Sequence, residues 1–104
     1  MKGKAFRMVE RKKYCVNGEW KDSKTEKWLP VTNSSTGELI AEVPCCTQDE
    51  LLEAIDAADK AFPAWSQMSL SKRTQMMFNW RNILVSHLDE LTVLCAKELG
   101  KTLS

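Results

Sequence analysis

Residues 38–62, with the sequence ELIAEVPCCTQDELLEAIDAADKAF, contain the change of pattern that decides the fold. Residues 38–44 have the period of two that predicts a strand, and Pro44 ends it. From residue 47 the period becomes 3.6. Thr47 and Glu50 have the spacing of a capping box, in which each side chain bonds the other residue's backbone amide. The stretch therefore predicts a strand followed directly by a capped helix.

One face of this helix is predicted to be buried, because its apolar residues recur at spacings of three and four: Leu51, Ile55, Ala58 and Phe62. Asp56 and Lys60 lie four residues apart in the order that favours an ion pair. Pro63 is expected to end the helix, since the residue before a proline disfavours the α conformation. Residues 64–70 would then form a connector in which Trp65 packs inward as a plug.

The preceding residues predict strands and turns. Residues 13–21 predict a hairpin around Asn17-Gly18, a dipeptide that favours a type I′ turn. Residues 22–27 are polar and predict a loop. Residues 28–33 predict a second strand that is irregular or at a sheet edge, because Pro30 has no amide hydrogen to donate. Residues 34–37 predict a turn.

Two further helices are predicted after residue 70. The first begins after Ser69 or Ser71 and runs to about Val85, with an apolar face made of Met76, Met77, Trp80, Ile83, Leu84 and Leu88. A second capping box at 86–89 predicts a break there. The last helix presents Leu88, Leu91, Leu94, Cys95 and Leu99, and Gly100 is placed to terminate it. Residues 101–104 are expected to begin a new element of a longer chain.

Composition limits the classes of function. The chain has 104 residues, which is one domain at most, and a net charge of +1 gives no field that would attract nucleic acid or an acidic membrane. No apolar run reaches the ~18 residues of a membrane span. Residues 1–12 are basic and are expected to be a flexible tail, not a secretory signal. The spacing of Cys15, Cys45, Cys46 and Cys95 predicts reduced thiols in a cytoplasmic compartment.

No catalytic, cofactor-binding or metal-binding residue is predicted. His87, the single histidine, is expected to be a surface or capping residue, and Cys95 is expected to pack in a core. Cys46 precedes a helix, which leaves open the alternative of a reactive thiol. No glycine-rich phosphate loop occurs. The apolar helix faces are expected to pack on a sheet outside this segment. A compact α+β mini-domain that acts as a non-enzymatic interaction module is the alternative.

Five motifs resemble those of aldehyde dehydrogenases, in the same order along residues 13–104. They are YCVNGEW at 14–20, NSSTGELIAEV at 33–43, AADKAFPAW at 57–65, Lys72-Arg73 at the start of a helix, and ELGKTL at 98–103. Residues 43–47 and 23–28 are most similar to the CoA-acylating methylmalonate-semialdehyde type. Ser34 stands where the family usually has proline, which is expected to loosen one turn.

The resemblance implies an α+β fragment, strands and then three helices, of a larger α/β Rossmann-like fold. Residues 13–46 would be amino-terminal strands and residues 47–104 an incomplete helical part of the NAD-binding domain. The whole enzyme would use NAD and CoA on a small-molecule aldehyde, methylmalonate or malonate semialdehyde, as a homo-oligomer without nucleic acid or membrane partners. The family's catalytic motifs would lie beyond residue 104, so this segment is expected to be an inactive scaffold that binds no cofactor alone. A subfamily that uses water in place of CoA is an alternative.

Overall fold

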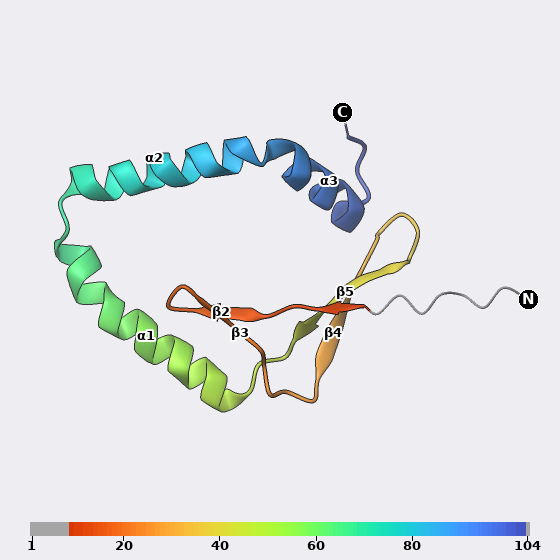
Figure 1. Cartoon of the computed structure of the whole chain (residues 1–104), viewed down its shortest axis with the longest axis horizontal. Coiled ribbons are helices and arrows are strands. Elements are labelled where there is room, and N and C mark those ends of the chain that lie inside the picture. The colour runs from red at the N-terminus through yellow and green to blue at the C-terminus, as the bar shows by residue number, and fades with distance from the viewer. Residues whose placement is uncertain (1–8, 104) are drawn as a thin grey trace, which may run out of the picture.

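The computed structural model describes residues 9–103, and strands precede helices as the sequence predicts (Figure 1). The strands are β1 (Glu10–Arg11), β2 (Tyr14–Val16), β3 (Glu19–Lys21), β4 (Trp28–Thr32) and β5 (Leu39–Pro44). The helices are α1 (Gln48–Gln67), α2 (Leu70–Ser86) and α3 (Leu88–Leu99).

A three-stranded sheet has the order β1-β5-β4, with β4 antiparallel and β1 parallel to the central β5. The edge position of β4 confirms the prediction made from Pro30. The short β1 lies within the segment predicted to be a flexible tail, so that boundary is wrong at residues 10–11. The remainder of the predicted tail that falls at residues 1–8 lies outside the described residues.

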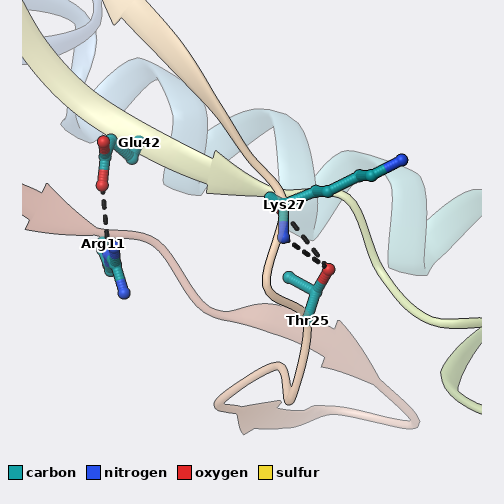
Figure 2. Close-up of polar contacts among 4 residues, drawn as sticks. All are labelled: Arg11, Thr25, Lys27 and Glu42. Atoms are coloured by element: carbon teal, nitrogen blue, oxygen red, sulfur yellow. Dashed lines mark hydrogen bonds and ion pairs between the residues drawn. The ribbon is translucent and has the colours of Figure 1, made fainter.

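Contacts from distant parts of the chain hold β1 in place. The Lys12 amide donates to the Glu42 carbonyl at 2.8 Å. Arg11 Nε donates to Glu42 Oε2 at 3.0 Å (Figure 2). The Arg11 guanidinium also lies 4.7 Å from the centre of the Trp28 ring, in cation–π range. Local sequence patterns could not predict this strand, because its partners are about thirty residues away in sequence.

The hairpin predicted around Asn17-Gly18 is confirmed. β2 and β3 pair antiparallel, and Asn17 and Gly18 have φ values of 51° and 76°, as a type I′ turn requires. The hairpin lies against α1, where Cys15 and Val16 border a groove lined by Ala54, Ala57, Ala58 and Ala61. Small side chains at these helix positions allow the strand to approach closely.

The capping box at the start of α1 is confirmed, because the Thr47 side chain accepts from the Glu50 amide and the Glu50 side chain accepts from the Thr47 amide. The prediction that Pro63 ends the helix is wrong: α1 continues one turn further to Gln67. Proline removes one amide donor inside a helix but does not forbid it. The final turn is held by the Met68 amide donating to the Trp65 carbonyl at 3.2 Å and by Ser66 Oγ donating to the Pro63 carbonyl at 3.1 Å.

The connector between α1 and α2 therefore consists of residues 68 and 69. Ser69, one of the two predicted starts, is the N-cap of α2, and its hydroxyl accepts from the Lys72 amide at 3.4 Å. The break after residue 86 is also confirmed. The capping box predicted there is wrong, because His87 occupies the N-cap of α3 without a side-chain bond and Ser86 Oγ donates backward to Ile83.

The described residues form a flat arrangement in which the helices follow one another in an open arc around the strands (Figure 1). It extends 63 × 39 × 17 Å. A thickness of 17 Å accommodates one layer of helices with their side chains, whereas a hydrophobic core needs two packed layers. Among the described residues, Val16 and Ala41 are the buried apolar ones.

The helix faces predicted to be buried are consequently exposed within this chain. Leu51, Ile55 and Phe62 of α1 are more than half exposed, Trp65 is 41% exposed and so is no plug, and Cys95 is exposed and so packs in no core. The apolar spacing was identified correctly, but no second layer within the described residues covers it.

Candidate functional site

Among the described residues, Glu50 in the first turn of α1 is the charged residue that is buried as a whole, with 8% exposure. Its Oε2 accepts from Ser23 Oγ at 2.7 Å and from the Thr47 amide at 2.9 Å. Its Oε1 accepts from the Lys24 amide at 2.8 Å. Three donors from two separate segments therefore meet on one side chain, which we call the Glu50 network.

The Glu50 network stabilises the ionised carboxylate. The Lys24 amide has the largest effect in lowering the pKa of Glu50, and the bonds from Ser23 and Thr47 add to it, while desolvation opposes them. A carboxylate whose oxygens are occupied by fixed donors is a poor general base, because its lone pairs are already used. The arrangement can join the 22–27 loop to the start of α1, and it provides no nucleophile.

Cys46 lies beside the Glu50 network and tests the alternative of a reactive thiol. Its pKa is raised, first by desolvation and then by the negative charge of Glu50. A reactive cysteine needs a lowered pKa, which the start of a helix could have supplied. The structure places a carboxylate there instead, and this carboxylate argues against the reactive-thiol alternative for Cys46. Sequence reasoning could identify Glu50 as a cap but not its position next to the thiol.

A groove of about 470 Å³ lies between the hairpin and α1. Its two cationic groups are paired: Lys21 Nζ bonds Glu53 Oε1, and Lys60 Nζ lies 2.6 Å from Asp56 Oδ2, as the i,i+4 spacing predicts. The bond to Glu53 raises the pKa of Lys21. Because both cations already have carboxylate partners, the groove offers no unpaired positive charge with which to select an anionic ligand.

The other predicted positions form no reactive group. His87 is exposed, and its Nδ1 lies 3.2 Å from Glu90 Oε2, which confirms a surface residue. All four cysteines are free thiols. Across residues 9–103 no three His, Cys, Asp or Glu side chains are placed to hold a metal ion. None of the helices in that range is long and apolar enough to cross a membrane.

Ser34 joins the turn at residues 33–37 to the end of α3. Its amide donates to the Lys97 carbonyl at 2.9 Å, and its hydroxyl donates to the Glu98 carbonyl. Gly100, with φ of +69°, ends α3 in the predicted left-handed conformation directly beside this turn. A proline at position 34 could not donate from its nitrogen. The prediction that serine loosens this part of the structure is therefore wrong, because serine supplies two bonds that proline lacks.

Comparison with known proteins identifies the class to which this arrangement belongs. The model of the aldehyde dehydrogenase family matches residues 20–104. The chain therefore belongs to the aldehyde dehydrogenase family.

Two curated relatives are similar over most of the chain. One, from Dictyostelium discoideum, is a probable mitochondrial acylating methylmalonate-semialdehyde/malonate-semialdehyde dehydrogenase and is 40% identical over 88% of this chain and 17% of its own length. The other, a malonate-semialdehyde dehydrogenase from Listeria monocytogenes, is 40% identical over 92% of this chain and 20% of its own length. The chain thus spans about a fifth of the length of these relatives.

Solved structures share the fold. A structure described as an E. coli NADP-dependent enzyme superposes with a TM-score of 0.81 and 37% identity, over 90% of this chain and 20% of that one. An aldehyde dehydrogenase from Bartonella henselae superposes with a TM-score of 0.85 and 27% identity, over 92% and 20%. The strands and three helices are therefore about a fifth of the aldehyde dehydrogenase fold, as the sequence motifs predicted.

Proposed function

We propose that this chain is the amino-terminal part of an NAD-dependent, CoA-acylating aldehyde dehydrogenase. The proposed substrates are methylmalonate and malonate semialdehyde, which would yield propionyl-CoA and acetyl-CoA. The observation that carries the proposal is the 40% identity to relatives named for these semialdehydes. A water-using subfamily of the same family is the second candidate.

Within that enzyme the segment would act as a scaffold without catalytic residues. The support is physical: the Glu50 network has its oxygens occupied by structural donors, and the thiol beside it has a raised pKa. Residues 13–46 would supply amino-terminal strands, extended by β1 at residues 10–11, and residues 47–104 would supply helices of the NAD-binding domain.

Residues 9–103 contain no glycine-rich turn at the start of a helix. A dinucleotide phosphate needs a run of free amides in a glycine-rich turn at a helix start. The Glu50 amide in the first turn of α1 bonds the Thr47 side chain, and the Lys72 amide in the first turn of α2 bonds Ser69. None of the three helix starts contains glycine. The cofactor and the CoA acceptor would therefore bind mainly to other parts of the enzyme, and no step of the reaction is assigned to this segment.

The test compares the 104-residue chain with the longer polypeptide obtained by reading its gene past codon 104. We expect an open frame that reaches a cysteine in a Gly-Gln-x-Cys-like motif, and NADH production by the longer protein that requires CoA. We expect no turnover by the 104-residue chain. A rate that is indifferent to CoA would favour the water-using candidate, and turnover by the short chain would refute the scaffold role.

The compartment and assembly of the enzyme are part of the same proposal. We propose a cytoplasmic homo-oligomer, and the mitochondrial name of the Dictyostelium relative indicates the alternative compartment. Imaging of the tagged long protein and its sedimentation in solution would test both.

A further inference from the structure

The turn at Asn17-Gly18 brings together two groups that can react with each other. Asn17 and Gly18 are both exposed, and across residues 9–103 neither the Asn17 side chain nor the Gly18 amide has a hydrogen-bond partner. A side chain built on Gly18 would meet no heavy atom within 4 Å beyond its neighbours in the chain. An electrophilic carboxamide carbon therefore lies next to an unhindered, unpaired backbone nitrogen.

The other three asparagines lack this combination. The amide that follows Asn33 belongs to Ser34 and donates to a carbonyl at the end of α3 at 2.9 Å. Asn79 and Asn82 lie inside α2, where each following amide bonds the carbonyl four residues back and each following side chain is bulky. Among the described residues, Asn17 is thus the asparagine whose neighbouring nitrogen is free.

We propose that Asn17 is a site of spontaneous deamidation, with water as the co-reactant. The Gly18 nitrogen loses its proton and forms a bond to Cγ of Asn17, while the bond from Cγ to the side-chain nitrogen breaks and ammonia leaves. Water then opens the cyclic succinimide at either of its carbonyl carbons. One opening gives aspartate, and the other gives isoaspartate, in which the main chain runs through the former side chain. The inference does not depend on the proposed function.

The conformation of the turn controls the rate of this reaction. The φ values of 51° and 76° place both residues in a type I′ turn. In such a turn the ψ of the first central residue is about +30°. Ring closure requires the Gly18 nitrogen and the Asn17 Cβ to be eclipsed about the Cα–C bond, whereas this ψ holds them on opposite sides. The reaction therefore requires the turn to open.

Deamidation would weaken the contact between the hairpin and α1. Asn17 lines the groove of about 470 Å³ together with Glu19, Glu53 and Asp56, so either product adds a fourth carboxylate to it. Like charges at this spacing repel one another. Isoaspartate also adds a main-chain atom between Val16 and Glu19, which pair directly across the turn. The pairing of β2 with β3 should therefore be weaker in the isoaspartate product.

The test incubates the longest polypeptide that the gene encodes at neutral pH and measures conversion of each asparagine by peptide mass spectrometry. Isoaspartate is detected by an isoaspartyl carboxyl methyltransferase with methyl-labelled S-adenosylmethionine. We expect conversion of Asn17 to be about tenfold faster than that of Asn33, where an amide hydrogen bond must break first. It should be about two- to tenfold slower than in the peptide of residues 13–21, where the turn is only marginally stable.

Asn17→Gly is the matched control, because Gly-Gly also favours a type I′ turn and has no carboxamide to react. Methyl labelling of the peptide that contains residue 17 should disappear in this variant. Labelling that persists there, or faster conversion at Asn33, Asn79 or Asn82, would overturn the site. Conversion as fast in the folded chain as in the peptide would overturn control by the turn.

The consequence for the hairpin is measured by hydrogen exchange of the β2 and β3 amides. Exchange should be faster in the converted fraction than in the unconverted fraction, and equal exchange would overturn the predicted weakening. None of these measurements uses NADH production. A failure of the proposed function would therefore leave the deamidation result unchanged, and a failure at Asn17 would leave the proposed function unchanged.

Discussion

The contact between Ser34 and the end of α3 gives a prediction whose size follows from two hydrogen bonds. Ser34→Ala removes the hydroxyl that donates to Glu98 and keeps the amide that donates to Lys97. Ser34→Pro removes both. A hydrogen bond of this kind contributes about 0.5–1.5 kcal/mol net. Alanine should therefore weaken the contact by about 0.5–1.5 kcal/mol and proline by about 1–3 kcal/mol.

The effect of proline on the entropy of the unfolded chain should not change the free energy of this contact, because the turn at residues 33–37 stays ordered when the contact opens. Asn33 Oδ1 accepts from the amides of Ser35 and Thr36 at 2.9 and 3.2 Å, and the Gly37 amide donates to the Asn33 carbonyl at 2.7 Å. These bonds do not involve residue 34. The difference between the two variants therefore isolates the amide bond to Lys97.

The assay is hydrogen exchange of the Gly100 amide, which donates to the Ala96 carbonyl at 2.9 Å in the last turn of α3. Opening of the contact should expose this amide. We expect exchange to be about two- to tenfold faster in Ser34→Ala and faster again by a similar factor in Ser34→Pro. Ser35→Ala, which changes the neighbouring hydroxyl, is the control. If the proline variant exchanged no faster than the alanine variant, the amide of Ser34 would have no stabilising role.

Three other properties can be tested on the same chain. The pKa of Glu50 is lower in the folded chain than in the unfolded chain, so the Glu50 network should stabilise the 22–27 loop fully at pH values above the unfolded pKa. This stabilisation should be lost as the pH falls through the folded pKa. The NMR shift of the Lys24 amide should change over the same acidic range, and Glu50→Gln should remove this pH dependence. Cys46, whose pKa is raised, should react with iodoacetamide more slowly near neutral pH than a cysteine in an unstructured peptide. An equal or faster rate would contradict the raising of the Cys46 pKa by burial and by the negative charge of Glu50. Gly100→Ala should destabilise the end of α3 by about 1–2 kcal/mol, because φ at this position is +69° and the new Cβ would lie 3.3 Å from Ser35 Oγ. Unchanged hydrogen exchange of the last α3 amides in this variant would argue against that strain.

Three features that depend on near neighbours were predicted correctly. The turn at Asn17-Gly18, the capping box at Thr47 and Glu50, and the termination at Gly100 each need residues within one turn of the chain. The errors at Pro63 and at residues 86–89 also concern neighbours, where two local tendencies compete. At Pro63 the surrounding helix persists despite one missing donor, and at residue 86 the serine hydroxyl bonds the preceding turn.

By itself the sequence determined the class of every major element, the order of strands and helices, and the family to which the chain belongs. It did so because caps, turns and apolar spacing are local properties, and because family motifs are read directly from residues. The tertiary structure alone decided that residues 10–11 pair with β5, that Glu50 meets Ser23 and Lys24, and that Ser34 holds the end of α3. These contacts join residues more than twenty-five positions apart, and their partners are fixed by the folding of the backbone and not by any local pattern.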